Sequence, residues 1–284
     1  MRKILAAILF ITFTCSPVFA QELTGTLQQI KKSETIRIGY RQSLPPMSFL
    51  GKNNIPEGYT IDLCQQIVAE VESNLNSKIS VEYVPVDADN RFDALIDNKI
   101  DLLCGATTKT LERQEKVDFT ELTFVTGASF LTLRGSGLEN NFEGKKIGVV
   151  DGTTTAAALK ALLKDAEIKA DVILLQATEK GVADVKDGKL DAFAADQVVL
   201  IGLIMASEKK SDFTILPDLF SYEPFAIALR RNDADFRLVA DRAITRLYRS
   251  EKIIPIYNKW FSQFSKKIPT AIEAMVQLHA TPEK

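Results

Sequence analysis

The segment Asp101-Leu-Leu-Cys-Gly-Ala-Thr-Thr-Lys-Thr-Leu-Glu-Arg113 is the stretch from which the fold of the chain can be worked out. Its apolar run stops at Gly105 and is followed by three threonines and Arg113, which predicts a strand that leads into a hydroxyl-rich turn. Ligands usually bind at the carboxyl ends of strands in open α/β sheets, and a guanidinium matches a carboxylate in shape. The segment is equally compatible with an anion site and with an ordinary turn in which Thr108 or Thr110 caps a helix.

Strands and helices alternate on both sides of this segment. Apolar spacing predicts a strand, a helix, a strand, a helix and a strand over residues 35–40, 59–75, 79–85, 91–97 and 100–104. The same order returns over residues 145–150, 156–164, 171–175, 179–187 and 190–194. This alternation is typical of parallel sheets with helices on their faces.

Short matches between the two halves favour two similar α/β lobes over one large sheet. Asn98-Lys-Ile-Asp-Leu102 is matched by Gly188-Lys-Leu-Asp-Ala192, and Arg37-Ile-Gly-Tyr40 by Lys146-Ile-Gly-Val149. Two strand-like runs, residues 124–132 and 222–229, are the candidate crossings between the lobes. We therefore expect lobe 1 to comprise residues 21–124 and 225–284, and lobe 2 residues 125–224. Helices at 234–250 and 253–264 are expected to pack on lobe 1, with Trp260 in its core.

The first twenty residues are typical of a cleaved signal peptide. Arg2 and Lys3 precede an apolar stretch too short to span a membrane, and Val18-Phe19-Ala20 offers a cleavage site. Cys15 suggests a lipoprotein as the alternative, but Thr-Phe-Thr before it lacks the small residues of a lipidation signal. We expect a mature chain of residues 21–284 in the periplasm, with its net charge changed from −2 to −4 by the loss of Arg2 and Lys3.

Composition excludes several classes of function. An acidic balance gives no basic surface for nucleic acid, and the longest apolar run of the mature chain, residues 198–206, is less than half a membrane helix. The chain has one histidine, His279, and no CxxC pair, so zinc sites and histidine-dependent catalytic triads are not expected.

Two cysteines remain after removal of the signal peptide, Cys64 and Cys104. A disulfide suits an exported protein, but it requires Cα atoms within about 7 Å of each other, which the sequence does not give. Two small buried apolar side chains are the alternative, and both interpretations remain open.

Two facing lobes would bring together the loops that follow their first and last strands. Those loops hold Arg41, residues 106–113, Thr153 with Thr154, and Asp196, and Arg91 begins a nearby helix. Asp151-Gly-Thr-Thr-Thr155 precedes a helix and is suited either to an anion or to a plain N-cap. A buried Asp196 needs a cation such as an ammonium. The predicted ligand carries one α-carboxylate, one α-amino group and a second anion facing Arg41 and Arg91, although each arginine alone is as compatible with a surface position.

Several motifs occur along the chain in the order of a known family: Gly39-Tyr-Arg41, Glu57-Gly-Tyr59, Asn90-Arg-Phe92, Cys104-Gly-Ala-Thr-Thr108, Glu112-Arg-Gln114, Val117-Asp-Phe119, Gly152-Thr-Thr154, Ala192-Phe-Ala-Ala-Asp196 and Lys259-Trp-Phe261. The whole mature chain resembles the periplasmic solute-binding proteins of polar-amino-acid ABC transporters, most closely the glutamate/aspartate-binding members. The resemblance implies an α/β fold of two lobes, each a mostly parallel sheet flanked by helices, joined by two hinge strands. It implies a monomer without cofactor or enzyme activity that delivers an amino acid to a membrane permease and its ATPase.

The resemblance also implies roles for individual residues. Arg113 and the backbone around Thr108 and Thr154 would take the α-carboxylate, while Asp196, Thr108 and the carbonyl of Ala106 would take the α-amino group. Arg41 and Arg91 occupy positions that hold a side-chain carboxylate. The expected ligand-binding set is Arg41, Arg91, Ala106, Thr108, Arg113, Thr153, Thr154, Lys180 and Asp196.

Four positions depart from the pattern of acidic-ligand binders. Ala88 and Ala106 stand where serine is usual, Lys180 stands where histidine is usual, and Met47 replaces an aromatic at the wall of the cleft. Glutamine, asparagine or a broad range of polar amino acids is therefore the alternative ligand class. A periplasmic prephenate or arogenate dehydratase and a sensor domain are further alternatives on the same fold. The dehydratase needs a general acid, and among the predicted site residues only Asp196 qualifies.

Overall fold

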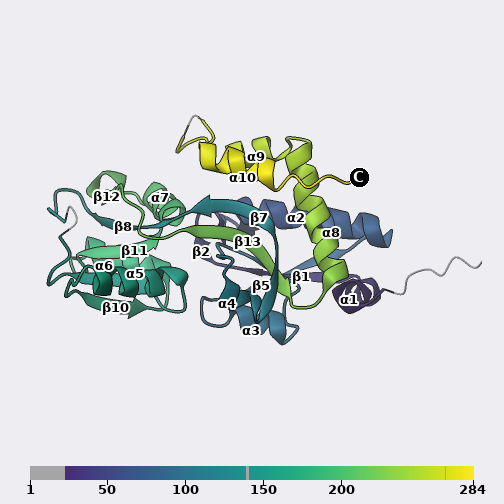
Figure 1. The fold of residues 1–284 in the computed structure, drawn as a ribbon, viewed down its shortest axis with the longest axis horizontal. Helices are drawn as coiled ribbons and strands as arrows, with labels where there is room; N and C mark the ends of the chain where they lie inside the picture. Colours follow the sequence, from purple (N-terminus) through teal and green to yellow (C-terminus); the bar gives the residue numbers. More distant parts are fainter. Residues whose placement is uncertain (1–22, 139–140, 266) are drawn as a thin grey trace, which may run out of the picture.

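The computed structural model describes residues 23–138, 141–265 and 267–284, and these form two α/β lobes joined by a pair of long strands (Figure 1). The predicted signal peptide, residues 1–20 with Cys15, lies outside the described residues. Within the described ranges, each helix is too short or too polar to cross a membrane.

Lobe 1 is built on a five-stranded sheet in the order β5-β1-β6-β13-β7. Its parallel strands β5 and β6 flank β1, whereas β13 runs antiparallel to both β6 and β7. The strands are β1 (Thr35–Tyr40), β5 (Ser80–Pro85), β6 (Leu102–Cys104), β7 (Val117–Thr126) and β13 (Glu223–Arg230). The helices are α1 (Gly25–Ser33), α2 (Tyr59–Leu75), α3 (Arg91–Ile96), α4 (Leu111–Gln114), α8 (Ala234–Arg249), α9 (Ile253–Phe261) and α10 (Thr270–Leu278).

Lobe 2 repeats this plan with the strand order β10-β9-β11-β8-β12. Its strands are β8 (Ala128–Leu133), β9 (Lys146–Val150), β10 (Asp171–Leu175), β11 (Ala192–Asp196) and β12 (Phe213–Ile215), and its helices are α5 (Thr154–Asp165), α6 (Thr178–Lys186) and α7 (Gln197–Ala206), followed by the 3-10 helix η1 (Lys210–Asp212). The predicted α/β fold of two lobes is confirmed. The sheets are mixed rather than mostly parallel as expected: each has two parallel and two antiparallel pairings, because the strand that follows a lobe crossing enters the sheet in the opposite direction.

The two crossings lie side by side. Strands β7 and β13 pair over their whole length, with Thr126 opposite Glu223, and extend from lobe 1 toward lobe 2 (Figure 1). The predicted single run over residues 124–132 is divided at Gly127, where a Cβ atom would lie 2.3 Å from the carbonyl oxygen of Ser221. The expected lobe boundary at residues 124/125 lies two residues before the end of β7, and the one at residues 224/225 lies within the first residues of β13.

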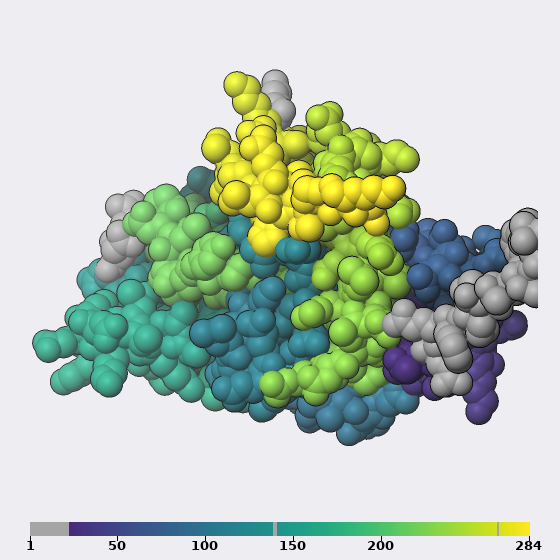
Figure 2. Space-filling model, turned by 45° about the vertical axis from the view of Figure 1, so that its right-hand side comes forward, coloured from purple at the N-terminus to yellow at the C-terminus, as the bar shows by residue number. Residues whose placement is uncertain are grey.

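The remaining elements sit at the margins of lobe 1. A small sheet of β2 (Ser43–Leu44), β3 (Ser48–Leu50) and β4 (Pro56–Glu57) stands where a loop was expected. Helices α9 and α10 form a raised block over the hinge side of lobe 1 (Figures 1 and 2). Trp260 is only partly buried: it packs against the edge of the core, its indole Nε1 donates to Asp62 (2.7 Å) and its ring meets Phe49 edge-on. Tyr257, one turn earlier in α9, and Phe261, the next residue, occupy the core position that was expected for Trp260.

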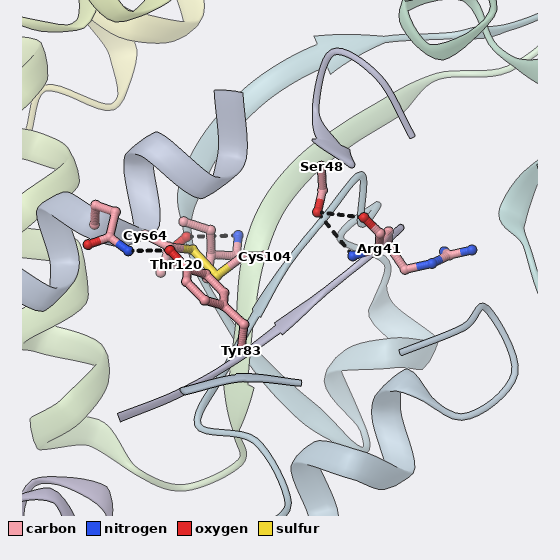
Figure 3. The surroundings of a disulfide bond; sticks show 8 residues. Arg41, Ser48, Cys64, Tyr83, Cys104 and Thr120 are labelled. Atoms are coloured by element: carbon pink, nitrogen blue, oxygen red, sulfur yellow. Dashed lines mark hydrogen bonds between the residues drawn. A yellow bond between two sulfur atoms is a disulfide. The ribbon is translucent and has the colours of Figure 1, made fainter. Parts of the chain in front are cut away.

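A disulfide joins α2 to the end of β6. Cys64 and Cys104 are bonded through their sulfur atoms, and their Cα atoms are 6.4 Å apart. Arg41 follows β1, the strand next to β6, and its backbone N–H donates to Ser48 Oγ. The Ser48 hydroxyl in turn donates to the Arg41 carbonyl (Figure 3). The disulfide therefore fixes the strand end that leads into the segment from Gly105 to Arg113.

Candidate functional site

One cavity lies where the lobes meet, and most of the predicted site residues surround it. Eight of the nine predicted ligand-binding residues line it: Arg41, Arg91, Ala106, Thr108, Arg113, Thr153, Thr154 and Asp196. Leu44, Val150, Thr155, Thr178, Ala194, Ala195 and Val199 complete the wall. The carboxyl ends of strands in both lobes thus converge, as expected for open α/β sheets.

Lobe 1 contributes Arg113 from a short capped helix. Thr110 is the N-cap of α4 and accepts from the backbone N–H of Arg113 (3.1 Å), so the predicted threonine cap is Thr110 rather than Thr108. The guanidinium of Arg113 lies over the ring of Phe92 and donates to the carbonyl of Thr108 (2.8 Å). These contacts hold Arg113 toward the cavity while leaving further N–H donors for a ligand.

Lobe 2 contributes the start of α5. The Thr153 hydroxyl donates to the carbonyl of Val150 (2.7 Å) and accepts from the backbone N–H of Ala156 (3.1 Å). It therefore acts as a plain N-cap, and that hydroxyl has no proton left to donate to a ligand. Thr154 at the first turn presents its hydroxyl toward lobe 1, where Thr108 Oγ1 lies 3.2 Å from Thr154 Oγ1.

A residue that the sequence analysis missed joins both lobes. Glu223, at the start of β13, is 1% exposed. Its Oε2 accepts from the hydroxyls of Thr108 (2.5 Å) and Thr154 (2.6 Å), and its Oε1 accepts from Ser221 (2.7 Å). The only signal in the sequence is a single carboxylate at the start of the apolar run 223–229.

Burial controls the electrostatics of the cavity. It raises the pKa of Asp196 to about 7, with the Glu223 carboxylate adding to the effect and Arg113 and Arg91 opposing it. Burial also lowers the pKa of Arg91 well below its usual range, and repulsion from Arg113 and Arg41 adds to this. The pKa values of Arg41 and Arg113 are likewise lowered by burial. Burial and mutual repulsion therefore destabilise the charged forms of the three guanidinium groups, and a bound anion would offset this destabilisation.

Two buried polar atoms of the cavity have no partner among the described residues. These are Arg91 Nε, a donor, and Asp196 Oδ1, an acceptor. Arg91 makes one cross-lobe hydrogen bond, from Nη2 to the carbonyl of Gly152 (3.2 Å). Buried polar groups are nearly always paired, so the orphan donor and the orphan acceptor call for a ligand that carries both charges.

Three residues expected near the ligand lie elsewhere. Lys180 does not line the cavity: its side chain is 59% exposed and pairs with Asp184 (2.6 Å) one turn along α6, so Thr178 at the start of that helix reaches the cavity instead. Met47 is fully buried in the core of lobe 1 rather than at the cleft wall, where Leu44 stands. Ala88 is buried, and its carbonyl faces Gly152 across the lobes.

The lobes are close together in this structure. Arg91 contacts Gly152, Thr108 contacts Thr154, and a Cβ atom on Gly202 of α7 would lie 2.1 Å from the carbonyl oxygen of Pro45 in lobe 1. The cavity volume is about 40 Å³, room for only a few water molecules at about 10–15 Å³ for each one. A ligand of amino-acid size therefore needs the lobes to separate before it enters.

Comparison with known proteins agrees with this geometry. Residues 36–263 match the family of bacterial extracellular solute-binding proteins, family 3. An L-glutamate/L-aspartate-binding protein of Pseudomonas aeruginosa is 33% identical over 87% of this chain and 83% of its own. A glutamate/aspartate import solute-binding protein of Salmonella typhimurium is 28% identical over 92% and 89% of the two chains.

Among solved structures, an ancestral arginine-binding protein bound to glutamine superposes with a TM-score of 0.72 at 27% identity, covering 80% of this chain and 98% of that chain. The family match extends from the first strand of lobe 1 to α9 and so includes both lobes and both crossings. The chain belongs to the bacterial extracellular solute-binding proteins, family 3.

Proposed function

We propose that this protein binds an acidic amino acid, glutamate or aspartate, in the cavity between its lobes and serves as the solute-binding component of an ABC importer. The pair of unpartnered buried atoms, Arg91 Nε and Asp196 Oδ1, is the observation that carries the proposal. A zwitterion supplies an acceptor for the first atom and a donor for the second. The relatives named for glutamate and aspartate support the same ligand class.

Charge balance favours an acidic ligand over a neutral one. Arg41, Arg91 and Arg113 bring three positive charges to the cavity, while Asp196 and Glu223 bring two negative charges. Among these five side chains the remainder is one positive charge, which glutamate or aspartate neutralises and glutamine or asparagine does not. Burial makes an uncompensated charge expensive, so the neutral amides should bind more weakly.

The roles follow from the positions of the groups. Arg113 and the backbone N–H groups at the start of α5 are suited to the α-carboxylate, because both a guanidinium fork and a helix N-terminus bind anions. Asp196, the Ala106 carbonyl and Thr108 are suited to the α-amino group. Arg41 and Arg91 are suited to the side-chain carboxylate. Lys180 is omitted from this set because Asp184 holds it outside the cavity.

The proposed role places the mature protein in the periplasm as a monomer that delivers its ligand to a permease and an ATPase. Binding without catalysis is the proposal, since Asp196 is the only general-acid candidate of the predicted set and is used for the ammonium. Prephenate is the substrate that tests the alternative. Phenylpyruvate formed on incubation with the protein would favour the dehydratase.

A thermal-shift screen over the twenty amino acids tests the ligand class. A ligand at one hundred times its Kd stabilises the folded state by about 2.7 kcal/mol. We expect glutamate and aspartate to raise the melting temperature most, glutamine and asparagine less, and arginine least. Calorimetry then gives the Kd values. A screen in which no amino acid raises the melting temperature would exclude the proposal.

A further inference from the structure

Glu223 is a buried carboxylate that contacts the cavity walls of both lobes. It lies on β13, one of the two strands that connect the lobes, and its Oε2 accepts from one hydroxyl in each lobe. Thr108 lies in the loop after β6, and Thr154 is the first residue of α5. Three oxygen atoms thus form a tight triangle, with the two hydroxyl oxygens 3.2 Å apart.

Counting protons assigns the direction of these hydrogen bonds. Each threonine hydroxyl has a single proton to donate and two lone pairs with which to accept. An ionised Glu223 is an acceptor only, so the contacts at 2.5 and 2.6 Å use both hydroxyl protons. The oxygen atoms of Thr108 and Thr154 are then left as acceptors, and both residues line the cavity.

We propose that Glu223 is a positioning residue for the ligand ammonium, acting through the hydroxyls of Thr108 and Thr154. By accepting both of their hydrogen bonds, Glu223 leaves the two hydroxyl oxygens as acceptors in the cavity that Asp196 also lines. Oxygen atoms that can only accept favour a ligand group with N–H donors and disfavour a carboxylate oxygen in the same place. The inference rests on the proposed binding of an amino acid and adds the residue that orients its amino-group contacts.

The other contacts of Glu223 fit this role. Ser221 donates to Oε1 and itself accepts from the backbone N–H of Ala128, which fixes the carboxylate plane from the lobe 2 side. The backbone of β13 is held by its pairing with β7, where Glu223 stands opposite Thr126. These contacts do not involve the cavity walls, so they orient the carboxylate independently of a ligand, which favours pre-organised recognition.

The variant Glu223→Gln tests the inference, with L-glutamate and glutarate as paired ligands. Glutarate keeps both carboxylates of glutamate and lacks only the amino group. A glutamine at 223 keeps the size of the side chain but replaces one of the two acceptor oxygens by an N–H₂ donor, so either the two threonines or Ser221 lose the acceptor that they use here. We expect the Kd for glutamate to rise at least tenfold, while the Ki of glutarate, measured by displacement of glutamate, changes less than threefold.

Glu121→Gln is the matched control. Glu121 lies on the neighbouring strand β7, and its carboxylate faces His279 (2.5 Å) rather than the cavity. Both ligands should bind this variant as they bind the unmodified protein. If Glu223→Gln does not fold, Thr154→Val removes one of the two hydroxyls and should give the same selective loss.

Three outcomes separate the possibilities. A selective loss for glutamate in either variant supports the inference. Equal losses for glutamate and glutarate, or a glutamate Kd within threefold of the unmodified protein, overturn it, because Glu223 would then only support the structure. Absence of amino-acid binding by the unmodified protein is a different result, which overturns the proposed function itself.

Discussion

Arg113 is the side chain on which proposed recognition of the α-carboxylate depends most. Its guanidinium is held over Phe92 and by the Thr108 carbonyl. Replacement by alanine would leave a desolvated carboxylate without its partner, at a cost of about 3–5 kcal/mol. We expect Arg113→Ala to raise the Kd for glutamate by roughly two to four powers of ten in calorimetry. Arg237→Ala, on the exposed face of α8, is the control and should leave the Kd unchanged. A loss below tenfold would place Arg113 outside the site.

Asp196 should couple binding to pH. Its pKa is raised to about 7, so the ligand-free carboxyl takes up a proton as the pH falls below about 7. The ligand ammonium requires the carboxylate and must displace that proton. We expect the affinity for glutamate to fall between pH 8 and pH 6, by up to about tenfold for each pH unit below the pKa. Calorimetry at three pH values measures this, and an affinity independent of pH would contradict the role.

The same raised pKa has the opposite effect on the ligand-free fold. The folded state holds the Asp196 proton more tightly than the unfolded chain does, so the free energy of unfolding falls as the pH rises from about 4 to about 7. Asp196→Asn removes this destabilisation. Ligand-free Asp196→Asn should therefore melt at a higher temperature than the unmodified protein at pH 8, whereas glutamate should no longer stabilise it. A lower melting temperature of the ligand-free variant would show that Asp196 is paired after all.

Residues at strand ends were the easiest to foresee. Arg113 and Asp196 follow apolar runs that end in polar residues, a local pattern that indicates a site. Glu223 was missed because its partners Thr108 and Thr154 are 115 and 69 residues away in sequence. Lys180 was wrongly expected in the cavity. Its position along the turn of α6 directs its side chain toward Asp184 instead. Thr178, two residues earlier on the same helix, does line the cavity, so the side of the helix on which a residue lies decides this and not its type.

At the scale of elements, the bridge between α2 and β6 should be a main source of stability. Cys64 and Cys104 are fully buried and close a loop of sequence separation 40. A cross-link of this span contributes about 2–4 kcal/mol, largely by constraining the unfolded chain. We expect Cys64→Ala combined with Cys104→Ala to lower the free energy of unfolding by this amount in urea. Reducing agent should destabilise the unmodified protein and leave the double variant unaffected; an equal response of both would contradict the bridge.

The exact bounds of some elements with strong local patterns were predicted from the sequence, whereas elements that depend on pairing with distant segments were not. The apolar spacing of Tyr59–Leu75 and the β-branched run Thr35–Tyr40 gave α2 and β1 with their observed bounds. The division between β7 and β8 falls at Gly127, which the Ser221 carbonyl approaches, a contact that no local pattern reveals. The two- and three-residue strands β2, β3 and β4 exist only through mutual pairing, so their short segments resembled a loop.

At the scale of the whole molecule, the internal repeat predicted two lobes, and the structure adds how closely they approach. These contacts between lobes come from loops and helices rather than from the repeated strands: Arg91 with Gly152, Thr108 with Thr154, and α7 with the segment around Pro45. These contacts reduce the cavity to about 40 Å³. The equilibrium between separated and closed lobes therefore contributes to the binding free energy. If a ligand is held only when the lobes close around it, its apparent affinity falls when the closed state becomes less populated.

Gly202 allows a direct test of this coupling. A methyl group there would lie 2.1 Å from the Pro45 carbonyl oxygen of lobe 1, too close without movement of the backbone. Overpacking of this kind costs about 1–3 kcal/mol, here only when the lobes close. Within α7, however, alanine is favoured over glycine by about 1 kcal/mol. We therefore expect Gly202→Ala to raise the Kd for glutamate about tenfold or more while leaving the melting temperature of the ligand-free protein unchanged or higher.

The control for Gly202 is a glycine of the same lobe with free space around it. Gly188 has a φ of +69°, and a Cβ atom there would have no other atom within 4 Å, so Gly188→Ala strains its own backbone without touching lobe 1. This variant should melt at a lower temperature and bind glutamate with unchanged affinity, the reverse of the pattern expected for Gly202→Ala. Small-angle scattering with saturating glutamate should show a more extended Gly202→Ala protein than the unmodified one. If Gly202→Ala binds glutamate as tightly as the unmodified protein, closure against Pro45 is not part of the bound state.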